Sequence, residues 1–126
     1  MDTAAAFNDR ITARDLAGLA ALMTDDHTFV DSTGSAVEGK PACVEAWRGF
    51  FVAFPDYHNV FSSLRDDDGV VTIVGRSECS VTALNGPALW QATVHDGLVA
   101  RWQVYEDTPE NRSRLRLPSP PGAPAG

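Results

Sequence analysis

Asp31 is the carboxylate best placed for proton transfer in this sequence of 126 residues. It closes the run HTFVD, and strand alternation over residues 27–32 puts Phe29 and Asp31 on one face. A carboxylate buried beside aromatic rings loses hydration, which raises its pKa and suits a general base. The alternative interpretation is a solvated carboxylate at the end of a strand.

Arg76 and Glu78 form a second polar cluster in the sequence. Two residues apart in a predicted strand, their side chains share one face, where arginine can orient a carboxylate or neutralise its charge. A salt bridge without chemistry explains the same spacing. Tyr57 follows Pro55, which ends a predicted helix, and it could donate a hydrogen bond at a cavity mouth or simply lie on the rim.

Other reaction classes lack the residues they need. The three histidines are scattered without metal-ligand spacing, and the DDDG turn at residues 66–69 lacks the later glutamate of a calcium loop. The sequence has no phosphate-binding glycine loop, and neither Cys43 nor Cys79 has a recognisable nucleophile context. We therefore expect neither a metal nor a cofactor.

The elements that must position these residues begin with helices. Apolar residues recur every three to five positions over residues 7–22, which predicts one helix or two short ones. Asp15 can cap a second segment, residues 16–23, and an acidic turn at Thr24-Asp25-Asp26 is expected to end it. A third helix is predicted between Pro41 and Pro55, with one large apolar face made of Val44, Trp47, Phe51 and Phe54.

The second half of the chain predicts antiparallel strands at residues 58–65, 70–84, 88–95 and 98–106. The segments DDDG, NGP and HDG separate them, and each is typical of a hairpin because Asn, Asp and Gly tolerate positive φ. Helices followed by such a meander indicate an α+β fold. Residues 1–117 then form a single domain, and the Pro-, Gly- and Ala-rich residues 118–126 are expected to be a disordered tail.

Composition narrows the range of partners. The formal net charge of −7 disfavours nucleic acid and anionic membrane surfaces, since both attract clustered positive charge. The sequence shows neither a signal-peptide pattern nor an apolar run long enough to span a bilayer. We expect a cytoplasmic protein with reduced cysteines.

The chain resembles the SnoaL-like group of the nuclear-transport-factor-2-like superfamily, which also holds ketosteroid isomerases, limonene-epoxide hydrolases and polyketide cyclases. The resemblance covers residues 4 to about 115 and rests on the segments DLAGLAALMTDDHTFVDSTG, WRGFFVAFPD and DGLVARWQVYED. It implies a cone-shaped α+β barrel, in which a strongly curved antiparallel sheet wraps over about three helices and encloses an apolar pocket. It also implies a homodimer.

Aligned with ketosteroid isomerases, Asp31 falls on the general base. Phe7 falls on the catalytic tyrosine and Trp90 near the second oxyanion-hole acid, so both donors are missing and a true steroid isomerase is disfavoured. Rings and polar groups expected to contact a small apolar substrate are Phe7, Phe29, Trp47, Phe51, Tyr57, Trp90, Trp102 and Glu106.

Three functions remain open at this point. The favoured one is a cofactor-independent isomerase or cyclase, with Asp31 as general base on a polyketide- or terpenoid-like carbonyl compound. The second is an epoxide hydrolase or epoxide-opening cyclase, because Arg76-Ser77-Glu78 resembles the Arg-x-Asp pair of limonene-epoxide hydrolases; Arg76, Glu78 and Asp31 would then be catalytic. The third is a non-catalytic ligand-binding or dimerisation module.

Overall fold

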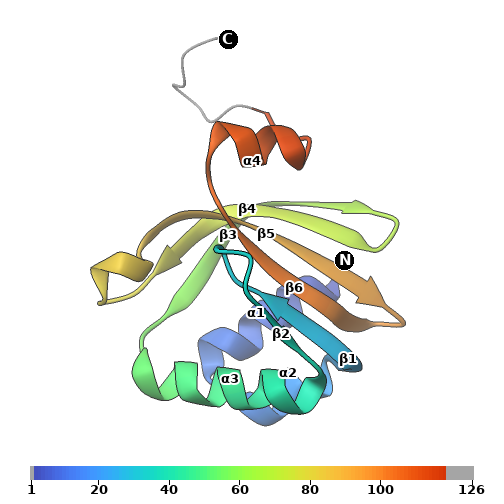
Figure 1. Ribbon diagram of the computed structural model, residues 1–126, viewed down its shortest axis with the longest axis vertical. Coiled ribbons are helices and arrows are strands. Elements are labelled where there is room, and N and C mark those ends of the chain that lie inside the picture. The colour runs from blue at the N-terminus through green and yellow to red at the C-terminus, as the bar shows by residue number, and fades with distance from the viewer. Residues whose placement is uncertain (1, 119–126) are drawn as a thin grey trace.

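Three helices lie against one face of a six-stranded sheet, and a fourth short helix follows the last strand (Figure 1). The structure is a computed structural model that describes residues 2–118. Its helices are α1 (Asp2–Ala13), α2 (Leu16–Ala21), α3 (Lys40–Ala53), the 3₁₀ helix η1 (Thr82–Leu84) and α4 (Pro109–Arg114). Its strands are β1 (Met23–Val30), β2 (Ala36–Glu38), β3 (His58–Asp67), β4 (Val70–Glu78), β5 (Gly86–His95) and β6 (Leu98–Glu106).

The sheet has the order β2-β1-β6-β5-β4-β3, which confirms the α+β class. The expected antiparallel sheet is wrong in one pair, because β1 runs parallel to β6. That pair joins strands from opposite ends of the chain, with α3 and the whole meander as the long crossover that parallel pairing requires. The end strands β2 and β3 do not pair with each other, so the sheet stays open and is not strongly curled into a barrel.

The N-terminal half has the predicted helices, but its first strand begins earlier in the sequence than predicted. The Gly18 amide donates to the Asp15 side chain at 2.9 Å, so Asp15 caps α2 as predicted. Thr24, Asp25 and Asp26 do not form the expected turn; they belong to β1, and the pairing of β1 with β6 shifts register between Met23 and Thr28. Pairing with a distant strand thus overrode the local turn propensity.

Three other elements differ from the sequence predictions. The expected strand 70–84 ends at Glu78, and its last three residues form η1. The short strand β2 and the helix α4 were not predicted, although Thr108 caps α4 by accepting from the Asn111 amide. Of the expected tail, residues 119–126 lie outside the described part of the chain.

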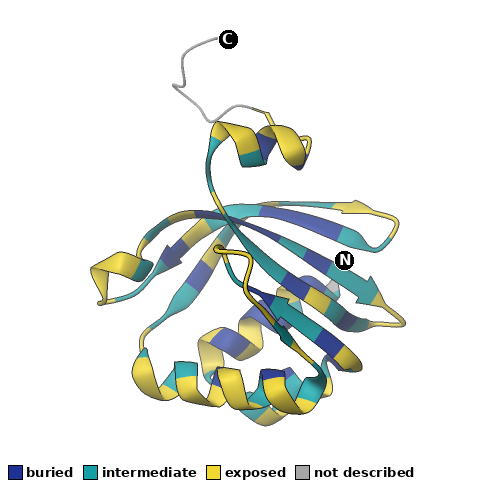
Figure 2. Ribbon diagram, viewed as in Figure 1, coloured by how far each residue is buried: buried dark blue, intermediate teal, exposed yellow. Residues whose placement is uncertain are grey.

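The core forms where the helices meet the sheet (Figure 2). Phe7 from α1 is fully buried and packs against Trp102 of β6, with ring centroids 4.7 Å apart. Trp90 of β5 is also fully buried and contacts Phe61 of β3. Within residues 2–118, no helix is both long and apolar enough to cross a membrane.

His27 is a fully buried histidine in this core, and it should make stability depend on pH. Its Nδ1 lies 2.6 Å from the Val99 carbonyl oxygen, which only accepts, so Nδ1 carries the proton. Its Nε2 has no hydrogen-bond partner among the described residues, and burial lowers the pKa of His27 below its ordinary 6.5. Protonation of Nε2 would bury a positive charge and a second N–H donor that has no hydrogen-bond acceptor among the described residues.

Since the unfolded chain binds a proton to His27 more readily than the folded one, stability is complete above pH 6.5 and is lost as pH falls below it. We expect a loss of about 1 kcal/mol in the free energy of unfolding between roughly pH 7.5 and 5.5, measured by urea titration. His27→Gln should flatten this dependence, whatever its cost at neutral pH. His95→Gln, at an exposed turn, should retain the wild-type pH dependence; equal slopes in the wild type and His27→Gln would contradict the assignment.

Candidate functional site

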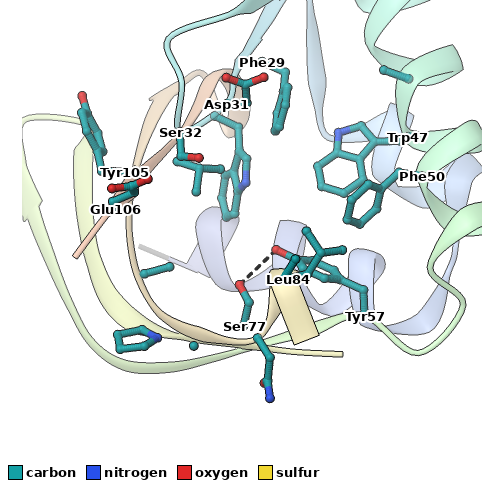
Figure 3. Close-up of a pocket in the computed structure, with 18 of the residues that line it drawn as sticks. Phe29, Asp31, Ser32, Trp47, Phe50, Tyr57, Ser77, Leu84, Tyr105 and Glu106 are labelled. Carbon is teal, nitrogen blue, oxygen red and sulfur yellow. Dashed lines mark hydrogen bonds between the residues drawn. The ribbon is translucent and has the colours of Figure 1, made fainter. Parts of the chain in front are cut away.

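A cavity of about 460 Å³ lies between α3 and the inner face of the sheet, and one end of it is covered by η1 (Figure 3). Most of its wall is apolar. Its rings come from Phe29, Trp47, Phe50, Tyr57, Trp102 and Tyr105, and its polar side chains are Asp31, Ser32, Ser77, Asn85 and Glu106. Such a cavity suits a flat, largely apolar molecule that is oriented by a few polar contacts.

Of the eleven residues predicted for a site, six line this cavity: Phe29, Asp31, Trp47, Tyr57, Trp102 and Glu106. The other five, Phe7, Phe51, Arg76, Glu78 and Trp90, do not line it. Phe7 and Trp90 are wholly in the core, where neither side chain reaches a ligand. Phe51 packs against Trp47 with the Arg14 guanidinium over its ring.

Asp31 lies directly after β1, in a tight turn that holds one of its carboxylate oxygens. Its Oδ1 accepts from the Thr33 hydroxyl at 2.6 Å, the Thr33 amide at 2.9 Å and the Ser35 amide at 3.1 Å. All three fall on Oδ1, which leaves Oδ2 free of hydrogen bonds within the part of the chain that the structure describes. Figure 3 shows this carboxylate beside the Phe29 ring.

The expected rise in the pKa of Asp31 is wrong. The hydrogen bond from the Thr33 hydroxyl, aided by the backbone amides of the turn, lowers the pKa of Asp31 below 3.8. These donors stabilise the charged form, and the partly exposed side chain is desolvated too little to offset them. Asp31 is therefore a fixed, ionised carboxylate at neutral pH.

Tyr57 and Ser77 form the polar part of the opposite wall. The Tyr57 hydroxyl lies 3.1 Å from the Ser77 hydroxyl, and this hydrogen bond is drawn in Figure 3. Burial raises the pKa of Tyr57, against the opposing effect of its hydrogen bonds with Ser77 and Asn59. Ser77 was not predicted, yet the alternation that pairs Arg76 with Glu78 puts Ser77 on the other face of β4.

Arg76 and Glu78 do share a face of β4, as predicted, but that face is turned away from the cavity. The Arg76 Nε lies 3.1 Å from the Glu78 carboxylate, which also contacts His58 Nε2 at 3.0 Å. All three side chains are at least 39% exposed, as expected for a surface ion-pair cluster. The epoxide-opening hypothesis loses its polar cluster, because only Asp31 of its three residues reaches the cavity.

Several residues that line the cavity were not predicted, two of them because their elements were predicted wrongly. Leu84 lies in η1, which was expected to continue a strand, and Asn85 caps η1 where a hairpin turn was expected. Phe50 is on α3, next to the predicted Phe51, and its ring packs edge-on against Tyr57 at 4.7 Å. Across residues 2–118, no three His, Cys, Asp or Glu side chains are grouped closely enough to hold a metal ion.

A known family accounts for this arrangement of helices, sheet and cavity. The model of the SnoaL-like domain matches residues 4–113, which is most of the chain. The chain belongs to the SnoaL-like family. None of the curated proteins matches the sequence.

Solved structures share the nuclear-transport-factor-2-like fold of this SnoaL-like chain at low identity. A candidate polyketide cyclase from Sinorhizobium meliloti superposes with a TM-score of 0.75 at 17% identity, covering 82% of this chain and 94% of its own. A candidate ketosteroid isomerase from Kribbella flavida gives 0.70 at 18%, covering 95% and 89%. A protein of unknown function from Cytophaga hutchinsonii, named for the same fold, gives 0.70 at 12%, covering 91% and 92%. At such identities the likeness shows the fold alone.

Proposed function

We propose that this SnoaL-like protein is a cofactor-independent enzyme of the isomerase or cyclase type. It would act on a flat, apolar carbonyl compound of polyketide-like or terpenoid-like character, with Asp31 as general base. The observation that carries the proposal is the Asp31 carboxylate in the wall of an aromatic cavity, held through Oδ1 and free at Oδ2. A positioned carboxylate with one free oxygen can accept a proton from bound substrate without moving.

The lowered pKa of Asp31 narrows the substrate class. A carboxylate of low pKa is always ionised at neutral pH, but it is a weak base and removes only acidic protons. A C–H between two carbonyl groups is far more acidic than one beside a single carbonyl. Its enolate also spreads the negative charge over two oxygens, which reduces the need for the oxyanion donors that Phe7 and Trp90 cannot supply. Polyketide-like 1,3-dicarbonyl compounds are therefore favoured over simple ketones.

The names of structural relatives agree with these reaction types. Two of the solved relatives are named as candidate polyketide cyclases, from Sinorhizobium meliloti and Shewanella putrefaciens. Another relative, TerC, was crystallised with polyporic acid. These names support a small-molecule ligand for the equivalent cavity of this chain.

Hydrogen exchange tests the proposal without knowledge of the natural substrate. The protein should accelerate deuterium incorporation at the central carbon of benzoylacetone, followed by NMR in weakly acidic deuterated buffer, where exchange catalysed by hydroxide is slow. Acetophenone, which has one carbonyl, should exchange no faster than in buffer alone. The absence of acceleration with benzoylacetone, despite binding in the cavity, would reject catalysis and favour a binding module.

A further inference from the structure

Four side chains connect the cavity to helix α1 through a continuous hydrogen-bond chain. The Tyr57 hydroxyl lies 3.1 Å from Ser77 Oγ, and Ser77 Oγ lies 2.8 Å from Asn59 Oδ1. Asn59 Nδ2 lies 3.2 Å from Asn8 Oδ1, and Asn8 Nδ2 lies 3.1 Å from the backbone carbonyl oxygen of Asn59. Asn8, Asn59 and Ser77 are each at least 92% buried, so these groups have few other partners to choose from.

The backbone carbonyl of Asn59 determines which group donates in each hydrogen bond of this network. A carbonyl oxygen only accepts, so Asn8 must turn its amide nitrogen toward it and its amide oxygen toward Asn59. Asn59 must then donate through Nδ2 to Asn8, which leaves its Oδ1 facing Ser77. Ser77 has one proton and gives it to that oxygen.

The Tyr57 hydroxyl therefore donates to Ser77 Oγ, since Ser77 has no second proton to offer in return. Its remaining lone pair is the part of the hydroxyl that is available to the cavity, which Tyr57 lines. Reversing one bond would leave two acceptors facing each other in a buried site, which is costly. The expectation that Tyr57 donates at the cavity mouth is thus replaced by the opposite polarity.

We propose that Tyr57 acts as a hydrogen-bond acceptor for the ligand and selects molecules that carry a hydroxyl or enol donor at that position. The two carboxylates in the cavity wall, Asp31 and Glu106, also accept when ionised. Of the remaining polar lining residues, Ser77 already donates to Asn59, whereas Ser32, Asn85 and Tyr105 can donate as well as accept. The cavity thus fits a flat apolar skeleton with hydroxyl groups at its edges, such as a hydroxylated aromatic or an enolised polyketide. This inference rests on the proposed function in using the same cavity, and it concerns recognition rather than turnover.

The test compares a naphthalenediol, with one hydroxyl on each ring, with its dimethyl ether, which can only accept. Isothermal titration calorimetry on the full chain should show the diol binding roughly tenfold more tightly than the ether, as one added hydrogen bond allows. Tyr57→Phe should remove most of this preference.

Ser62→Ala is the matched control, because the Ser62 hydroxyl donates to the Val74 carbonyl and does not line the cavity. It should leave both affinities unchanged. An unchanged preference in Tyr57→Phe would overturn the inference. This result is independent of the exchange assay. The ligand preference can therefore hold while catalysis fails, and catalysis can hold while the preference fails. If neither compound binds the wild type, the inference is also overturned.

Discussion

Asp31→Asn is expected to lower the rate of benzoylacetone exchange by roughly 10²–10⁴-fold, the usual contribution of a positioned general base. Asparagine is isosteric, and its amide oxygen can still accept from Thr33 and Ser35, so the turn should keep its shape. Its amide cannot take up a proton from carbon. The affinity for the naphthalenediol should change far less than the rate, which separates loss of chemistry from loss of the cavity.

The pH dependence gives this prediction a second readout. Because the pKa of Asp31 is lowered from its ordinary value, the loss of activity on the acid side should lie at lower pH than an unperturbed aspartate would give. Thr33→Val removes the hydroxyl that lowers this pKa most, so the decline should move to higher pH. A general base other than Asp31 would leave the pH profile of Thr33→Val unchanged.

Asp56→Asn is the control for the charge change. Asp56 also has a lowered pKa, through hydrogen bonds with Ser80 and Cys79, but it does not line the cavity. Its replacement should leave the exchange rate at the wild-type value. Full activity in Asp31→Asn would exclude Asp31 from proton transfer and direct attention to Glu106, the other carboxylate in the wall.

The elements that sequence predicted well are those whose signals are local. The helical periodicity, the cap at Asp15 and the DDDG and HDG turns all act within a few residues, and the structure has α1 to α3 and these two hairpins accordingly. The predicted NGP turn is wrong, because Gly86 and Pro87 belong to β5 and η1 forms the connection from β4. The start of β1 and its parallel pairing with β6 depend on contacts with residues some seventy positions away. Such pairings are decided by tertiary packing, which a local pattern does not encode.

The sequence indicated which residue types belong to the candidate site better than it indicated which side chains reach the cavity. Strand alternation groups side chains by face, but it does not say which face is turned toward the cavity, so Arg76 and Glu78 were chosen while Ser77 was missed. Position along a strand matters equally: Ala88 and Trp90 share a face of β5, yet only Ala88 reaches the cavity. The pKa of Asp31 depended on a turn whose hydrogen bonds appear only in three dimensions.

Arg112→Met is expected to lower the free energy of unfolding by about 3–5 kcal/mol, the usual effect of removing one partner of a buried ion pair. The Arg112 guanidinium contacts both oxygens of Asp107, at 2.6 and 2.8 Å, and only 9% and 10% of the two side chains is exposed. This pairing raises the pKa of Arg112. Methionine fills a similar volume, but it leaves the Asp107 carboxylate buried without its counter-charge.

Urea unfolding followed by far-UV circular dichroism measures this loss, with two controls. Arg48→Met breaks an exposed ion pair with Glu45 on α3 and should cost less than about 1 kcal/mol. The double variant Asp107→Leu with Arg112→Met removes both charges and should recover much of the stability. A double variant no more stable than Arg112→Met would show that packing, rather than the unpaired carboxylate, causes the loss.

The loss of stability in Arg112→Met should extend beyond α4, because hydrogen bonds connect both ends of this helix to the sheet. Arg65 of β3 donates to the carbonyl oxygens of Leu115 and Arg116, and the Asn111 side chain donates to the Glu106 carbonyl. Glu106 in turn lines the cavity, so loosening α4 also loosens one wall of the candidate site. Arg112→Met should therefore weaken binding of the naphthalenediol as well as stability. If only α4 frays while diol affinity and the main unfolding transition stay unchanged, this connection is absent.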